Sequence, residues 1–155
     1  MTFPVLGSWM TGPTVAPVPE LSPRLRAVVD ALPLRPGLRV VEIGCGPGAA
    51  AREVAERIGP SGHVLAVDRS AKAIAQVQAT SFDLIAAGRL STRQCAAEDL
   101  VLEPGEERYD LAFAVRVGAF DGRHPAAGER AMARLVDVLV PGGRLFVDGR
   151  ERELA

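Results

Sequence analysis

One short run of residues combines a carboxylate with three glycines at alternate positions. It reads Glu42-Ile43-Gly44-Cys45-Gly46-Pro47-Gly48, and it lies between the β-branched pair Val40-Val41 and a run that is typical of a helix start. A strand that turns abruptly into a helix through glycines brings bare backbone close to a ligand. The run therefore predicts a ligand-binding loop, in which the carboxylate of Glu42 accepts hydrogen bonds from a polar or cationic part of that ligand.

The spacing of the glycines distinguishes this loop from two other nucleotide-binding loops. A dinucleotide loop has the order G-x-G-x-x-G, whereas Gly48 comes one position too early for that order. A phosphate-binding P-loop ends in Lys followed by Ser or Thr, and no such pair follows Gly48. An NAD-dependent oxidoreductase is therefore disfavoured, and a P-loop is excluded.

Further side chains are suited to binding or to proton transfer. Asp68 ends an apolar run 20 residues after the last glycine of the loop, and a short carboxylate there can hold both hydroxyls of a ribose. Asp121 and His124, in the segment 116–125, are the candidate general bases. The alternative for His124 is a plain loop residue beside a helix that starts at Pro125.

Four other polar residues have weaker claims to a role. Arg116 either reaches a carboxylate of the cofactor or substrate, or is simply solvated. Cys45 is expected to point off the glycine loop, with no neighbour that would lower its pKa, and Cys95 is expected to fill space at a strand end. His63 begins a strand at the opposite edge and is expected to be structural. The two cysteines form no metal-ligand pattern, so no metal site is predicted.

The elements that must position these residues alternate between strands and helices. Strands are expected at 39–43, 63–67, 90–94, 109–115 and 144–147, with a turn at 141–143 before the last. Helices are expected at 21–32, 47–58, 71–87 and 126–139, where apolar residues recur at helical spacing. The helix at 71–87 would bury Ile74, Val77, Phe82 and Ile85.

This order of elements predicts the fold class. It is an α/β fold with a doubly wound, mostly parallel sheet of about five strands and helices on both faces. Such sheets bind ligands beyond the carboxyl ends of their strands, where the winding reverses. The glycine loop and Asp68 both follow strands, so they are expected to lie together at that edge.

Length and composition limit the class of protein. The 155 residues suit one domain, which we place at 21–155 after a proline-rich N-terminal arm at 1–20. Phe3, Trp9 and Met10 of that arm are candidates for an apolar lid. With 18 basic and 19 acidic residues, there is no electrostatic reason to expect nucleic acid as a partner. No signal peptide or membrane span is recognisable, which favours a cytoplasmic protein.

The loop, Asp68 and two further segments resemble the class I S-adenosylmethionine-dependent methyltransferases. The E-x-G-x-G-x-G spacing resembles their motif I, the run 139–145 resembles their L-x-P-G-G-x-L turn, and the run 97–100 resembles their adenine-binding segment. The resemblance covers about 36–148 and implies a Rossmann-like fold with S-adenosylmethionine as cofactor. Many relatives have Asp where this chain has Ala96, so one acceptor for the adenine amine is missing. The cofactor-binding residues that the resemblance implies are Glu42, Gly44, Cys45, Gly46, Gly48, Asp68, Arg69, Ala97, Glu98 and Arg116.

The resemblance implies methyl transfer, and the residues narrow the acceptor. The segment after the fourth strand lacks the [DN]-P-P-[YF] motif of enzymes that methylate DNA bases or protein glutamine, so a small-molecule substrate is expected, with no nucleic acid and no membrane as partner. The alternative is a non-catalytic or repurposed module that binds S-adenosylmethionine or S-adenosylhomocysteine.

The C-terminus bears on the oligomeric state. The family usually continues after strand five with a helix and a reversed hairpin, whereas this sequence has seven residues after Asp148. Three interpretations follow: a homodimer joined through an open sheet edge, a minimal fold covered by the N-terminal arm, or a shortened form of a longer protein. Because apolar edges invite pairing, the homodimer is favoured.

Overall fold

The computed structural model describes residues 17–154. The proposed N-terminal arm and the proposed lid residues Phe3, Trp9 and Met10 therefore lie outside the described residues, apart from 17–20, which have no regular structure.

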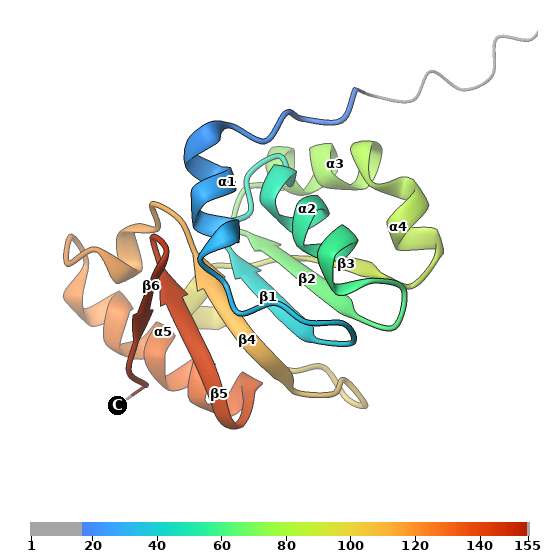
Figure 1. The fold of residues 1–155 in the computed structure, drawn as a ribbon. Helices are drawn as coiled ribbons and strands as arrows, with labels where there is room; N and C mark the ends of the chain where they lie inside the picture. The colour runs from blue at the N-terminus through green and yellow to red at the C-terminus, as the bar shows by residue number, and fades with distance from the viewer. Residues whose placement is uncertain (1–16, 155) are drawn as a thin grey trace, which may run out of the picture.

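Six strands form one sheet in the order β3-β2-β1-β4-β5-β6, parallel except for β6. Figure 1 shows this sheet between two layers of helices. The winding reverses between β1 and β4, which are neighbours in the sheet although two strands separate them in the sequence. The strands are β1 (Arg39–Ile43), β2 (His63–Asp68), β3 (Leu90–Gln94), β4 (Tyr109–Ala114), β5 (Leu139–Val147) and β6 (Arg150–Arg152).

The helices cover the two faces of the sheet unequally. Alternate residues of each strand point to opposite faces, so Val40 packs with the first four helices and Val41 packs with α5. The apolar runs in the central strands are long because both faces are covered. The helices are α1 (Pro23–Asp30), α2 (Ala49–Ile58), α3 (Ala71–Thr80), α4 (Phe82–Ala86) and α5 (Pro125–Val138), with short 3₁₀ turns η1 (Ala97–Asp99) and η2 (Gly118–Phe120).

The helix expected at 71–87 is in fact two helices. The backbone leaves helical geometry at Ser81 (φ −120°, ψ 26°), and this change of direction shifts the buried face. Leu84 is buried instead of Phe82, whose exposed fraction is 72%. The prediction that Phe82 is buried was therefore wrong, because a periodic pattern does not show where a helix bends.

The last part of the sheet also differs from the prediction. The run 139–147 is one strand with an irregular register opposite Tyr109 and Leu111, and it has no separate turn at 141–143. A sixth strand, β6, pairs antiparallel with β5. The free edge of the sheet on this side is therefore β6, a short and fully exposed strand.

The charge pattern at this edge works against self-pairing. Residues 150–153 alternate Arg-Glu-Arg-Glu. In a symmetric antiparallel pair, side chains that meet across the two strands must lie on the same face, so Arg meets Arg and Glu meets Glu. Like charges directly opposite one another are destabilising, and charged side chains are a common means of protecting edges.

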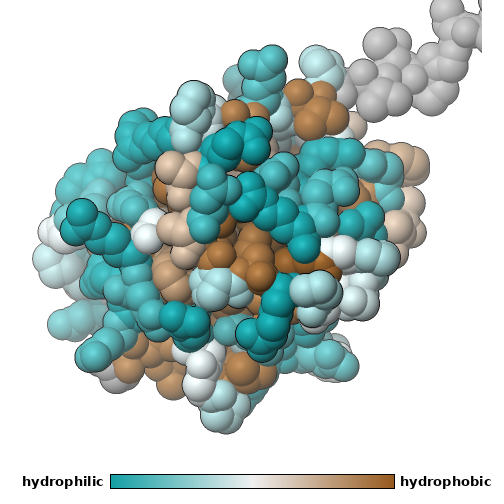
Figure 2. Space-filling view, in the orientation of Figure 1, coloured by the Kyte–Doolittle hydropathy of each residue, from teal (hydrophilic) through white to brown (hydrophobic). Residues whose placement is uncertain are grey.

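Figure 2 shows a mostly hydrophilic face, with hydrophobic side chains visible near its middle, where α1 and β1 lie. In the span 17–154, no helix is long and apolar enough to cross a membrane.

Candidate functional site

Two cavities adjoin at the carboxyl ends of β1 and β4, where the winding of the sheet reverses. The first, of about 480 Å³, is lined by residues that follow β1, β2, β3 and β4. The second, of about 360 Å³, lies between the glycine loop and the start of α1. Both are lined by Gly44, Val115 and Arg116. An elongated ligand can therefore cross from one to the other over Gly44.

The three glycines of the loop serve different purposes. All have positive φ, from +53° to +94°. A Cβ at Gly44 would lie 2.6 Å from Val117 Cγ2, and one at Gly48 would lie 2.9 Å from Val77 Cγ2, so these two glycines permit close packing. A Cβ at Gly46 would meet no atom within 4 Å. Gly46 therefore presents bare backbone to open space, as expected of a residue that a ligand approaches.

Asp68 connects the end of β2 to the glycine loop. Its Oδ2 accepts a hydrogen bond from the backbone N–H of Gly46 (3.0 Å), and its Oδ1 accepts one from the N–H of Ser70 (2.8 Å). A carboxylate has about four lone-pair positions, so each oxygen can still accept one further bond. Asp68 lines the first cavity and is held rigidly enough to present both oxygens to a pair of hydroxyls.

Glu42 lies at the wall of the second cavity. Its exposed fraction is 3%, and its Oε2 has no hydrogen-bond partner among the described residues. Burial raises the pKa of Glu42 well above its ordinary value, and the negative charge of Asp68 raises it further. A buried carboxyl group without a partner is costly, and a cationic group placed in the cavity would offset that cost.

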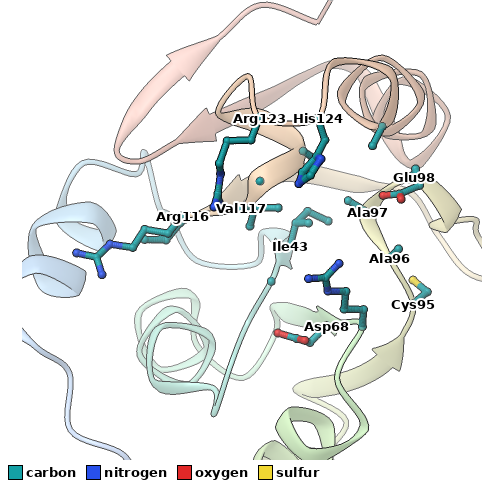
Figure 3. Close-up of a pocket in the computed structure, with 16 residues that line it drawn as sticks. Ile43, Asp68, Cys95, Ala96, Ala97, Glu98, Arg116, Val117, Arg123 and His124 are labelled. Carbon is teal, nitrogen blue, oxygen red and sulfur yellow. The ribbon is translucent and has the colours of Figure 1, made fainter.

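Arg116 lies at the junction of the two cavities in an unusual backbone conformation. It and Asp148 are the two non-glycine residues with positive φ in the described chain, at +53° and +50°. The N–H of Arg116 donates to Asp148 Oδ1 (2.8 Å). Figure 3 shows the guanidinium of Arg116 pointing away from Asp68 and Glu98. The second cavity is also lined by Arg24 of α1.

The segment after β3 forms one wall of the first cavity. Cys95, Ala96, Ala97 and Glu98 all line it, together with Arg69 from the end of β2. The backbone carbonyl of Glu98 accepts a hydrogen bond from Arg134 Nε of α5 (3.2 Å), which fixes the 3₁₀ turn η1.

The two candidate bases occupy different positions. His124 lines the first cavity, and its ring lies against Gly118, where a Cβ would be 3.1 Å from His124 Cδ2. Figure 3 shows His124 and Arg123 extending toward Val117. Asp121 does not line either large cavity at these strand ends. It pairs with Arg123 (2.6 Å to Nε), and hydrogen bonds from the Arg123 backbone and side chain lower the pKa of Asp121.

The cysteines and His63 have the environments of structural residues. Cys45 lines the second cavity but is buried, and burial together with the charges of Glu42 and Asp68 raises its pKa far above the ordinary value. Burial also raises the pKa of Cys95. His63 bridges β2 and β3 at the opposite edge of the sheet, with Nδ1 2.8 Å from the carbonyl of Gly88 and Nε2 2.7 Å from Ser91 Oγ. The described residues contain no group of three or more His, Cys, Asp or Glu side chains that could hold a metal ion.

Sequence reasoning missed the contribution of the N-terminal helix to the site. Ser22, Arg24 and Leu25 line the second cavity, although the pattern of α1 indicated only an amphipathic helix. No motif marks them, because they reach the site by packing of α1 beside the glycine loop. Arg123 and Val117 were likewise not singled out, and both line the first cavity.

Comparison with known proteins gives a consistent result. The model of a methyltransferase domain family matches residues 40–143. The chain is 35% identical over 116 residues to the ubiquinone/menaquinone biosynthesis C-methyltransferase UbiE of Bordetella parapertussis, covering 74% of this chain and 41% of that protein. It is 29% identical over 127 residues to the nocamycin O-methyltransferase of Saccharothrix syringae, covering 82% and 43%.

The fold is similar to that of solved methyltransferases. One is an S-adenosylmethionine-dependent methyltransferase from Geobacter sulfurreducens in complex with S-adenosylhomocysteine, with a TM-score of 0.61 and 24% identity over 82% of this chain and 48% of that one. The chain spans less than half the length of the curated relatives it matches. Since the family match extends over most of the sheet and includes the glycine loop and Asp68, this chain belongs to the class I S-adenosylmethionine-dependent methyltransferase family.

Proposed function

We propose that this protein transfers a methyl group from S-adenosylmethionine to a small-molecule acceptor. The observation that carries the proposal is the pair of adjoining cavities with a carboxylate on each side of Gly44. Asp68 lies on the first cavity and the unpartnered Glu42 lies on the second. This arrangement fits a ligand that carries a ribose on one side of Gly44 and an ammonium group on the other.

The residues around the cavities match the parts of the cofactor. Asp68 would accept hydrogen bonds from the ribose hydroxyls with the lone pairs that remain on its oxygens. Glu42 would face the amino group of the methionine part, which compensates its buried charge. Arg116 and Arg24, which line the same cavity as Glu42, would hold the carboxylate. Ala97 and Glu98 would lie beside the adenine.

Catalysis by this chain would depend chiefly on positioning. When bound, the cofactor supplies a methyl group already activated by its attachment to a positively charged sulfur. The wall after β4 would orient the acceptor for in-line approach at about 3–3.5 Å and exclude water. His124 is the candidate to accept a proton, since it lines the first cavity. Asp121 is a weaker candidate, because its pairing with Arg123 stabilises the charged carboxylate and makes it a poorer base.

A small-molecule acceptor is supported by two observations. Two of the curated relatives are named for quinone biosynthesis and for nocamycin, one as a C-methyltransferase and the other as an O-methyltransferase. The residues after β4, Val115-Arg116-Val117-Gly118, lack the motif of enzymes that methylate amino groups of DNA bases. Because the relatives differ in the atom they methylate, the proposal covers the acceptor class and leaves the atom open.

Calorimetry with S-adenosylmethionine, S-adenosylhomocysteine and NAD tests the cofactor part of the proposal. We expect the protein to bind S-adenosylmethionine and S-adenosylhomocysteine and not to bind NAD. Asp68→Ala should weaken binding by about 2 kcal/mol, or about 30-fold, whereas Asp137→Ala, an exposed position on α5, should not change it. Unchanged affinity in Asp68→Ala would remove Asp68 from the site.

A product screen tests the transfer itself. Cell extract incubated with methyl-labelled cofactor and the protein should yield a labelled small molecule. Tight cofactor binding without any labelled product would instead support the alternative, a module that binds the cofactor for another purpose.

A further inference from the structure

The hairpin formed by β5 and β6 contacts both ends of the segment 116–120, which includes residues that line the first cavity, and it also lies beside α1. Its turn, Asp148-Gly149, has positive φ at both residues (+50° and +82°), a geometry suited to a tight two-residue hairpin. Apart from residues 139–143 of β5, the hairpin lies beyond the part of the chain that the family model matches. Its residues have no role in the proposed function.

The first contact holds the start of the wall after β4. The N–H of Asp148 donates to the carbonyl of Ala114 (2.9 Å), and Asp148 Oδ1 accepts from the N–H of Arg116 (2.8 Å). Asp148 therefore holds the chain at the end of β4 from both sides of Val115. The left-handed backbone of Arg116 is a conformation that a non-glycine residue keeps only when its surroundings impose it.

The second contact holds the end of the same wall. Arg152 Nη1 of β6 donates to the carbonyl of Phe120 (2.9 Å). Phe120 ends the 3₁₀ turn η2, and its side chain is buried against α5 and the sheet. The residues between these two contacts, Val117, Gly118 and Ala119, line the first cavity.

The third contact joins the tip of the hairpin to α1. A Cβ placed on Gly149 would lie 3.8 Å from Val28 Cα and 3.8 Å from Ala31 Cβ. The hairpin is thus packed between α1, whose first turn lines the second cavity, and the wall of the first. Pairing of β6 with β5 keeps these contacts in register, since Arg144 and Glu151 form two hydrogen bonds across the two strands (2.9 and 2.7 Å).

We infer that the β5–β6 hairpin holds residues 116–120 in place as a wall of the first cavity, with Asp148 and Arg152 as positioning residues. That this wall faces the methyl acceptor rests on the proposed function. The inference gives β6 a role: the strand places the guanidinium of Arg152 on the carbonyl of Phe120, which ends the wall.

Hydrogen exchange of the ligand-free protein tests the inference at Arg152. In Arg152→Gln, where the shorter side chain cannot reach Phe120, the amides of 116–120 should exchange about fivefold faster, the change expected from loss of one hydrogen bond of ordinary strength. Amides of β1 should be unchanged. Arg150→Gln on the same strand is the matched control and should behave as the unsubstituted protein.

Substitutions at Asp148 separate backbone strain from the hydrogen bond. Asp148→Asn keeps an acceptor and tolerates positive φ, so it should leave the exchange of 116–120 unchanged. Asp148→Gly relieves the strain but removes the acceptor, so it should accelerate the exchange. Unchanged exchange at 116–120 in both Arg152→Gln and Asp148→Gly, or equal acceleration throughout the protein, would overturn the inference. The exchange experiment uses no ligand, so it tests the inference independently of cofactor binding. Failure to bind the cofactor would bear only on the proposed function.

Discussion

Gly46→Ala should separate the effect of a residue on the fold from its effect on the ligand. The backbone at Gly46 has φ +53°, and a Cβ there would meet no protein atom within 4 Å. The substitution therefore costs only the strain of a left-handed residue, about 1–2 kcal/mol of unfolding free energy. Gly88 has φ +73° with equally open surroundings and lines neither cavity, so Gly88→Ala is the matched control with a similar cost.

Binding should distinguish the two variants. The methyl group at residue 46 would project into the space that the cofactor is proposed to occupy, and overpacking of this kind costs about 1–3 kcal/mol. This corresponds to about 5- to 150-fold weaker binding of S-adenosylhomocysteine, measured by calorimetry, with urea unfolding as the measure of stability. Gly88→Ala should bind as the unsubstituted protein does.

Two results would refute this reasoning. If Gly46→Ala binds S-adenosylhomocysteine as tightly as Gly88→Ala, the ligand does not approach the backbone at this point. If Gly46→Ala and Gly88→Ala weaken binding equally, the weaker binding results from strain in the fold and not from a contact between residue 46 and the ligand. Gly44→Ala gives a useful contrast, because its Cβ would lie 2.6 Å from Val117 Cγ2, so it should destabilise the fold more than either.

Three further predictions concern charges. The raised pKa of Glu42 means that this carboxyl group binds its proton more tightly in the folded chain than in the unfolded chain. Glu42 therefore lowers the stability of the fold increasingly as pH rises above the ordinary pKa of 4.5. Glu42→Gln should raise the melting temperature more at pH 8 than at pH 5, and it should weaken binding of S-adenosylmethionine. Paired hydrogen bonds from Arg52 lower the pKa of Asp83 to about 2, so this pair stabilises the fold above about pH 4 and ceases to do so as pH falls to about 2. Because the side chain of Asp83 is 62% exposed, the pair contributes less than about 1 kcal/mol to stability. In Asp83→Asn, the urea midpoint of unfolding should therefore change less with pH over that range than in the unsubstituted protein. Because like charges would meet if β6 paired with a second copy of itself, we expect light scattering to show a monomer of 16.3 kDa. This replaces the homodimer that was predicted from an open apolar edge. Detection of a dimer that is abolished by a proline substitution in β6 would contradict the expectation.

Much of the fold was predictable because its central strands are buried on both faces. The bounds of β1 agree with the prediction, and those of β2 and β4 each differ by one residue at the C-terminal end. The bounds of α5 differ by one residue at each end. Such runs are recognisable because burial imposes apolar residues at every position or at helical spacing. The parallel sheet follows from the alternation of strands and helices, whereas the position of its reversal, between β1 and β4, is known from the structure.

The departures occur where contacts distant in sequence determine the local structure. The break at Ser81 coincides with burial of that residue and with the ion pair between Arg52 and Asp83, neither of which a periodic pattern reveals. The strand β6 consists of Arg150, Glu151 and Arg152, which have no apolar pattern, and it forms because a tight turn brings it against β5.

The sequence by itself determined the family and the residues of the glycine loop, because three glycines and a carboxylate at fixed spacing require a particular local backbone. Only the tertiary structure decided which side chains complete the site. It brought Arg24 from α1 beside the loop, placed His124 on the first cavity and Asp121 outside both, and set Asp148 against Arg116. The physical reason is that a loop motif encodes its own backbone, whereas the cavity walls come from packing between elements far apart in the chain.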